Sequence, residues 1–338
     1  MIERLWYVRG LFPHPLLWPL LPLSWLYFLI VVLRRRRYLS GSVESYRPAV
    51  PVVMVGNLTV GGTGKTPLVI WLAEYLKKQG MKPGVVSRGY GGSAQDWPRL
   101  VSAASNPAEV GDEPVLIARR TRIPVVCDPQ RARAVQRILQ YGVNIIIADD
   151  GLQHYALQRD LEIVVIDSGR GFGNGQCLPA GPLREPASRA AHANLLVFNG
   201  ERRRLPGTED LPSAEMLLEG GILRCLGGGR EESLGDWRGK RVHAVAGIGN
   251  PQRFFDSLRR MGMDPIPHAF PDHHKYAESD LRFKEDLPVV MTEKDAVKCA
   301  DFQNPLHWYL PVTARFEPAS ANLLDNAVKG MLRGFKAA

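Results

Sequence analysis

The chain has 338 residues, of which 45% are apolar and 23% charged, and its formal net charge is +9. This length and composition are those of one or two globular domains and exclude a wholly disordered chain. The positive charge favours an anionic partner, such as nucleic acid, a phosphorylated substrate or an acidic membrane surface. The four cysteines form no Cys-x-x-Cys pair, which indicates reduced thiols rather than a disulfide framework or a zinc ribbon.

The N-terminal segment has the composition of a membrane anchor. Between Arg9 and Arg34 it contains no Asp, Glu, Lys or Arg, and four prolines interrupt it. The unbroken apolar part, 23–33, would be roughly 16 Å long as a helix, too short for a hydrocarbon core of about 30 Å. The arginines at 34–37 suit an anionic cytoplasmic leaflet. We predict that residues 1–37 form a monotopic anchor on the cytoplasmic face; a true span and a helix buried against the protein's own body are the alternatives.

A glycine-rich stretch at 51–66 has the order of a phosphate-binding loop. An apolar run at 52–55 predicts a buried strand, glycines follow it, and a helical pattern begins at Lys65. In such a loop the backbone N–H groups bind phosphate, Lys65 contacts the β- and γ-phosphates, and the Thr66 hydroxyl is a Mg²⁺ ligand. The usual spacing has glycine at position 59, where this chain has threonine. The predicted nucleotide-binding residues are Thr59, Val60, Gly61, Gly62, Thr63, Gly64, Lys65 and Thr66.

Strand and helix patterns alternate after this loop. Apolar strand runs recur at 85–86, 125–128, 145–148, 161–166 and 194–198, with helical periods between several of them. This alternation predicts an α/β fold built on a doubly wound parallel sheet, whose ligands lie beyond the carboxyl ends of the strands.

The composition changes after residue 200, where charge clusters and glycines interrupt the pattern. A second, smaller α/β unit begins at Lys240 with a strand, a Gly-Ile-Gly turn and a helix capped by Asn250. The predicted domains are therefore a nucleotide-binding domain at 38–205, a connector at 206–239 and a C-terminal domain at 240–338.

Three acidic residues are candidates for chemistry. Asp149 and Asp150 follow a run of three isoleucines, and carboxylates at a strand end suit Mg²⁺, which prefers oxygen ligands. A pair of solvated, helix-capping acids is the alternative. Asp112 lies in a loop near the strand ends and is either a general base or an ordinary helix N-cap.

Histidines occur in the string Asp272-His273-His274 and at His154. Each could be structural or a metal ligand, and one of the pair could hydrogen-bond to a carboxylate base across a cleft and alter its pKa. The residue pattern alone does not decide between these roles.

Seven strings in this order resemble those of the tetraacyldisaccharide 4'-kinase (lipid A 4'-kinase) family. They are GNLTVGGTGKTP at 56–67, SRGYG at 87–91, GDEP at 111–114, DDGLQH at 149–154, LPAGPLREP at 178–186, FPDHH at 270–274 and TEKDAVK at 292–298. The phosphate loops of this family share this departure from the usual glycine spacing at position 59.

The resemblance implies a P-loop kinase that uses ATP and Mg²⁺ to phosphorylate the 4'-hydroxyl of a tetraacylated glucosamine disaccharide 1-phosphate, the lipid A precursor. It implies an enzyme at the cytoplasmic face of the inner membrane, and we expect a monomer with no nucleic-acid partner. The aspartate at Asp112 is then the base, assisted by His273 or its neighbour His274, with Asp149 and Asp150 near the metal. For Gln153 and Arg184 the resemblance implies only proximity to the site.

Three other functions fit parts of this sequence. A membrane-peripheral nucleotide hydrolase or switch without a lipid acceptor is the main alternative, although the string at 292–295 only faintly echoes a guanine-selecting motif. A non-catalytic lipid-binding module leaves Lys65 and the acidic pair without a purpose. A metal phosphoesterase built on 272–274 ignores the phosphate loop.

Overall fold

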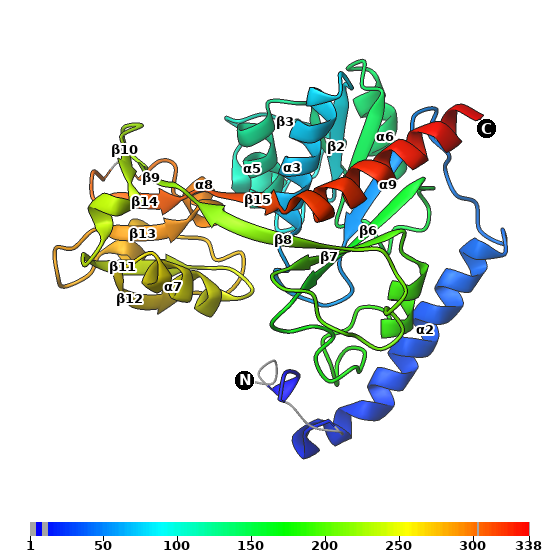
Figure 1. Cartoon of the computed structure of the whole chain (residues 1–338), viewed down its shortest axis with the longest axis horizontal. Helices are drawn as coiled ribbons and strands as arrows, with labels where there is room; N and C mark the ends of the chain where they lie inside the picture. The colour runs from blue at the N-terminus through cyan, green and yellow to red at the C-terminus, as the bar shows by residue number, and fades with distance from the viewer. Residues whose placement is uncertain (1–4, 9–12, 303, 338) are drawn as a thin grey trace.

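The computed structural model describes residues 5–8, 13–302 and 304–337, which form two lobes (Figure 1). The larger lobe contains a nine-stranded sheet in the order β15-β8-β7-β6-β1-β5-β2-β4-β3, parallel except at its edge strands β3 and β15. The doubly wound parallel sheet expected from the sequence is confirmed. Its strands are β1 (Val52–Gly56), β2 (Pro83–Ser87), β3 (Arg99–Val101), β4 (Val125–Cys127), β5 (Ile145–Asp149), β6 (Leu161–Asp167), β7 (Leu195–Asn199), β8 (Ser213–Gly220) and β15 (Val312–Phe316).

Helices cover both faces of this sheet, so its central strands are buried on both sides. In β1, Val53 and Val55 pack into one apolar core, whereas Val52 and Met54 pack into the other. This explains why the sequence of β1 is a continuous apolar run rather than an alternating one. The helices of the lobe are α3 (Lys65–Lys78), α4 (Pro107–Val110), α5 (Asp112–Thr121), α6 (Arg131–Leu139), the 3-10 helix η2 (Ala187–His192) and α9 (Pro318–Ala337).

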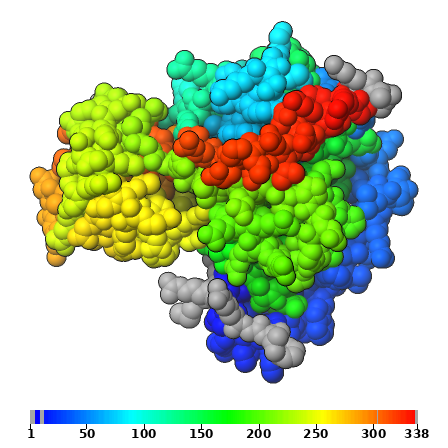
Figure 2. Space-filling view, viewed as in Figure 1, coloured from blue at the N-terminus to red at the C-terminus, as the bar shows by residue number. Residues whose placement is uncertain are grey.

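The smaller lobe is built on a six-stranded sheet in the order β10-β9-β14-β13-β11-β12. Its core contains Trp237 and Trp308, whose ring centroids lie 5.1 Å apart in an edge-on arrangement. Figure 2 shows this lobe, in yellow and orange, beside the larger one. Its elements are β9 (Ile222–Cys225), β10 (Glu231–Ser233), η3 (Leu234–Trp237), β11 (Arg241–Ala246), α7 (Pro251–Arg260), β12 (Asp264–Ala269), η4 (Glu278–Leu281), β13 (Val289–Thr292), α8 (Glu293–Lys298) and β14 (His307–Leu310).

The two lobes are joined by two chain segments, and this changes the domain boundaries that we expected. Residues 206–239, expected as a connector, contribute β8 to the larger sheet and β9 and β10 to the smaller one. Residues 312–337, expected in the C-terminal domain, return to the larger lobe as β15 and α9. The reason is strand pairing: β15 runs antiparallel to β8, with Val312 opposite Gly220, so both crossings lie side by side.

The N-terminal segment forms one continuous helical rod, η1 (Pro15–Leu20) followed by α2 (Leu21–Leu39). It is longer than the prolines led us to expect, because Pro19 lies in the 3-10 turn and Pro22 lies in the first turn of α2, where a missing N–H is tolerated. Among the described residues, 15–39 is the one helix long and apolar enough to cross a membrane by length and composition.

The rod lies along the larger lobe (Figure 1), but little of it is buried. Ser24 Oγ donates a hydrogen bond to the Cys177 carbonyl at 2.6 Å, and Tyr27 donates to the Arg184 carbonyl at 3.1 Å. The rest of its apolar surface is largely exposed, which argues against a helix buried on the protein's own body. These exposed residues are Leu16, Trp18, Leu23, Trp25, Leu26, Phe28, Leu29, Ile30 and Leu33.

Candidate active site

The predicted phosphate loop joins β1 to α3 at the carboxyl edge of the larger sheet. Gly64 precedes the helix with φ +96°, and a Cβ at this position would lie 2.4 Å from Asn199 Nδ2, so only glycine fits. The Lys65 side chain is nearly buried; its Nζ donates to Asn57 Oδ1 at 3.0 Å and lies 3.7 Å from Asp150 Oδ1. The loop therefore holds its lysine against a carboxylate and leaves its glycines at the sheet edge.

A cavity of about 620 Å³ opens at this edge. It brings together most of the residues predicted from the sequence, namely Val60, Gly61, Gly62, Lys65, Asp149, Asp150, Gln153, His154, Arg184 and His273. Asp112 is nearly buried and, with His273, lines an adjoining cavity of about 160 Å³. The predicted residues that do not line the larger cavity are Thr59, Thr63, Gly64, Thr66 and His274.

The two acids at the end of β5 have different electrostatic environments. Asp149 is buried, and burial together with the charges of Glu113 and Asp150 raises its pKa to about 7. Its Oδ2 accepts a hydrogen bond from Ser87 at 3.3 Å, whereas its Oδ1 has no partner among the described residues. A buried carboxylate oxygen without a donor, next to a phosphate loop, fits a divalent cation.

Asp150 is held by cations instead. Although burial opposes ionisation, the charges of Lys65 and Arg184 keep its pKa far below the usual range. Arg184 Nη1 lies 2.9 Å from Asp150 Oδ2. Asp150 also has a left-handed backbone, φ +47°, which is uncommon for a residue other than glycine and is often found at functional sites.

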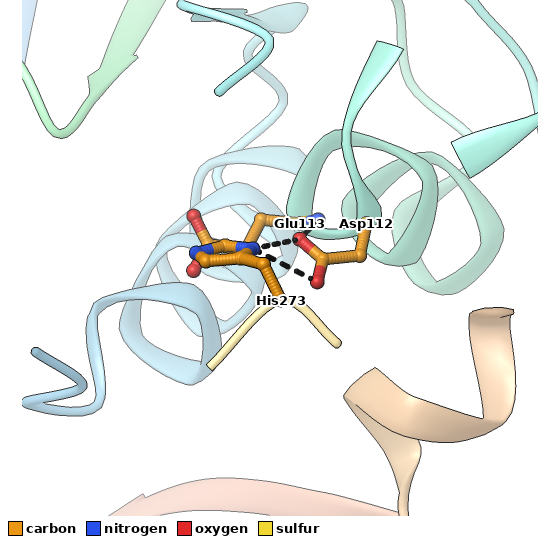
Figure 3. Close-up of side chains that lie close together, drawn as sticks. All are labelled: Asp112, Glu113 and His273. Atoms are coloured by element: carbon orange, nitrogen blue, oxygen red, sulfur yellow. Dashed lines mark hydrogen bonds and ion pairs between the residues drawn. The ribbon is translucent and has the colours of Figure 1, made fainter. Parts of the chain in front are cut away.

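The Asp112 carboxylate and the His273 ring come from different lobes and form a pair (Figure 3). Asp112 is the first residue of α5, and His273 lies in the loop after β12. His273 Nδ1 lies 3.2 Å from Asp112 Oδ1 and 3.1 Å from Oδ2. His273 has φ +58°, a second left-handed residue at the site. His274 instead pairs with Asp280 at 3.0 Å.

The pair favours its charged forms. Burial disfavours the Asp112 carboxylate, but the hydrogen bond from His273 and the charges of Lys294 and Lys298 outweigh it and lower the pKa of Asp112. Burial also disfavours the imidazolium, but the hydrogen bond to Asp112 outweighs it and raises the pKa of His273. Asp112 is therefore ionised throughout the physiological pH range.

Lys294, at the start of α8, contributes a cation that sequence reasoning did not assign to the site. Its Nζ lies 3.0 Å from Glu113 Oε1, 3.2 Å from Asp272 Oδ1 and 3.9 Å from Asp112 Oδ2. Asp112, Glu113 and His273 are close enough to one another to hold a metal ion, but the ammonium group already supplies positive charge there. Lys294 is part of the family-like string at 292–298, but nothing in the sequence indicates that it contacts residues of the other lobe.

Arg131 is a second residue that sequence reasoning missed. It lies at the start of α6, is almost fully buried, and its Nη2 donates to the Asp149 carbonyl at 2.8 Å while the residue lines the cavity. Burial and the guanidinium groups of Arg131, Arg88 and Arg34 lower the pKa of His154 to about 3. His154 is thus a neutral imidazole near three guanidinium groups, whose charge suits an anionic ligand.

The chain is similar to known proteins over most of its length. Residues 16–329 match the family model described as tetraacyldisaccharide-1-P 4'-kinase. The chain is 52% identical over 304 residues to a tetraacyldisaccharide 4'-kinase of Alkalilimnicola ehrlichii, covering 90% of each chain. It is 49% identical over 324 residues to one from Pseudomonas putida, covering 95% of each.

A solved structure is similar over nearly the whole chain. It is the crystal structure of LpxK from Aquifex aeolicus in complex with ATP, with a TM-score of 0.78 and 29% sequence identity over 94% of this chain and 99% of that one. At this coverage the likeness extends over both lobes.

Proposed function

The chain belongs to the tetraacyldisaccharide-1-phosphate 4'-kinase family, and we propose that Asp112 is the base and Lys65 the phosphate-binding cation of its reaction. The enzyme transfers the γ-phosphate of ATP to the 4'-hydroxyl of a tetraacylated glucosamine disaccharide 1-phosphate. The observation that carries the proposed roles is the meeting of Lys65, the acidic pair and the Asp112–His273 pair at one edge of the sheet. A nucleotide switch has no acceptor hydroxyl to deprotonate, so it would not need a base such as the Asp112 carboxylate, which His273 contacts from the other lobe.

The phosphate loop binds and orients ATP. Backbone N–H groups of residues 61–66, at the start of α3, would bind the phosphates, and Lys65 would move from its contacts with Asn57 and Asp150 to the β- and γ-phosphates. Asp149, Asp150 and Thr66 would hold Mg²⁺, which would neutralise negative charge on the phosphates. Most of the catalysis is then positioning and electrostatic stabilisation.

Asp112 removes the proton from the acceptor. Its carboxylate accepts the proton of the 4'-hydroxyl as that oxygen bonds to the γ-phosphorus, and the bond from this phosphorus to the β–γ bridging oxygen breaks to release ADP. His273 holds the carboxylate in place from the other lobe. Lys294 and Lys298 keep it ionised, which a base requires.

The helix α2 and its arginines would hold this site at a membrane. Its exposed apolar side chains suit the boundary of a bilayer, and Arg34–Arg37 suit anionic headgroups on the cytoplasmic face of the inner membrane. Tyr27 and Arg34 also line the cavity, so a lipid acceptor that keeps its acyl chains in the bilayer would reach the site along this helix. Because α2 contacts the lobe along one side, a monotopic position is favoured over a span.

The test is transfer of radiolabelled γ-phosphate from ATP to a purified disaccharide 1-phosphate in detergent micelles. Asp112→Asn should lower kcat by about 10²- to 10⁴-fold, as expected for loss of a general base, with ATP binding retained. Asp280→Asn, which removes the carboxylate paired with His274, is the matched control and should keep wild-type rates. A wild-type rate in Asp112→Asn would exclude Asp112 as the base.

A further inference from the structure

Arg253, in the smaller lobe, contacts the larger lobe close to the phosphate loop. Arg253 lies in the first turn of α7, and its Nη1 forms an ion pair with Asp167 Oδ2 at 3.1 Å, at the end of β6. Its Nη2 donates to Asn199 Oδ1 at 2.6 Å, at the end of β7. Asp167 and Asn199 are both nearly buried, so one guanidinium group from the smaller lobe contacts two adjacent strand ends of the larger lobe.

Asn199 contacts both Arg253 and the phosphate loop. Because arginine can only donate, its contact fixes Oδ1 toward Arg253 and leaves Nδ2 toward the loop, where it donates to the Thr63 carbonyl at 3.0 Å. The Thr63–Gly64 peptide is trans, so its N–H points opposite to its carbonyl and away from Asn199. Asn199 is buried and does not line the cavity.

The same region is closely packed at a second point. Arg170, in the larger lobe, donates to the Gly249 carbonyl just before α7. A Cβ at Gly249 would lie 2.3 Å from the Gly62 nitrogen, so the backbone of the smaller lobe is in direct contact with the loop. A shift of α7 relative to the larger sheet would therefore change the surroundings of the loop.

We propose that Arg253, Asn199 and Thr63 form an interlobe latch, in which Arg253 is a positioning residue for ATP binding. With the latch closed, Asn199 holds the Thr63–Gly64 peptide so that its N–H is available to a phosphate oxygen. When the smaller lobe moves away, Asn199 loses its fixed orientation and the loop loses this donor. The latch rests on the proposed role of the loop in ATP binding. It makes the affinity for ATP depend on the position of the smaller lobe, which also contains His273.

The test measures KM for ATP and KM for the acceptor separately in the full-length enzyme. Arg253→Met should raise KM for ATP by about five- to twentyfold, the size expected for one or two lost positioning hydrogen bonds, and change KM for the acceptor less than twofold. Arg253→Lys should fall in between, because one ammonium group cannot contact Asp167 and Asn199 with the same geometry. Asn199→Ala should have an effect similar to that of Arg253→Met.

The double variant Arg253→Met/Asn199→Ala separates a latch from two independent contacts. If Arg253 acts through Asn199, the double variant should bind ATP no more weakly than the more severe single variant. Arg259→Met, an exposed arginine on the same helix, should behave as the wild type. Additive effects, equal changes in both KM values, or an unchanged KM for ATP in the variants would each overturn the latch.

The same assay distinguishes failure of the latch from failure of the proposed site. If Lys65→Met abolishes ATP binding but the Arg253 variants bind ATP normally, the loop binds ATP and the latch is wrong. If Lys65→Met also binds ATP normally, the nucleotide site itself is elsewhere. Thermal unfolding without nucleotide shows whether each variant is folded, and Arg253→Lys provides the test if Arg253→Met is not.

Discussion

Lys65 is nearly buried at the start of α3, and its ammonium group is the cation of the phosphate loop. Replacing it with methionine keeps most of its apolar stem and removes the charge. Lys65→Met should lower kcat/KM for ATP by about 10²- to 10³-fold, the size seen when one preorganised donor to a developing charge is removed. The measurement is the phosphate-transfer rate at several ATP concentrations.

Lys78→Met is the control for this change, because Lys78 lies at the exposed end of the same helix. It should keep wild-type kinetics and a wild-type melting temperature. If Lys65→Met were as active as Lys78→Met, the loop would not be the phosphate site.

The Asp112–His273 pair makes a prediction about pH. The hydrogen bond to Asp112 raises the pKa of His273 above its ordinary 6.5, although burial acts in the opposite direction. In Asp112→Asn this support is lost and burial remains, so the pKa of His273 should fall below the wild-type value. NMR titration of ¹⁵N-labelled histidine measures it, with Asp280→Asn as the control in which His273 titrates as in the wild type. An unchanged His273 pKa in Asp112→Asn would show that the pair does not form in solution.

The pKa shifts of His273 and Asp112 also determine how the stability of the folded protein changes with pH. The raised pKa of His273 contributes stability that is complete below pH 6.5 and is lost as the pH rises through the folded-state pKa. The lowered pKa of Asp112 contributes stability that is present above pH 3.8 and is lost as the pH falls through its folded-state value. The pair therefore stabilises the protein most between these two limits.

Among the elements, α2 is the one whose surface is least explained by the protein's own packing. Trp25 and Leu29 are 63% and 50% exposed, and burying such side chains in a bilayer contributes about 1.5–3 kcal/mol each. Trp25→Gln/Leu29→Gln should therefore weaken binding to anionic phospholipid vesicles by at least about tenfold. Co-sedimentation with the vesicles measures the bound fraction.

Leu323→Gln on α9 is the matched control, because Leu323 is also exposed but lies on another helix. It should leave vesicle binding unchanged. Equal vesicle binding by the α2 double variant and the wild type would mean that the protein attaches to membranes through another surface.

At the scale of elements, most of the larger lobe could be predicted from the sequence. The apolar runs of β1, β5 and β6 have no polar face, which is the pattern of strands buried on both sides, and the structure places them at the centre of the sheet. Proline predicted the N-terminal helices less well, since Pro19 in η1 and Pro22 in the first turn of α2 lie where a helix tolerates them. The sequence pattern does not separate a helix that begins at a proline from one that the proline breaks.

What the sequence could not supply is the relation between the two lobes. The return of residues 312–337 to the larger sheet depends on pairing between β15 and β8, which are about a hundred positions apart. The contacts of Lys294 with Glu113, and of Arg253 with Asn199, depend on how the lobes face each other. The hydrophobic periodicity of a sequence carries no information on such contacts. The phosphate loop and the acids at the end of β5, in contrast, directly follow predicted strands, so their positions in the fold could be predicted from the sequence.

For the whole molecule, the central claim is that the triphosphate lies on the loop of the larger lobe while Asp112 and His273, one from each lobe, face its γ-phosphate. A crystal structure with Mg²⁺ and a non-hydrolysable ATP analogue tests this directly. We expect the phosphates against Gly61–Thr66, Lys65 Nζ released from Asp150, and the γ-phosphate on the side of the cavity that holds Asp112. An empty loop with the nucleotide bound elsewhere, or a γ-phosphate directed away from Asp112, would contradict the account.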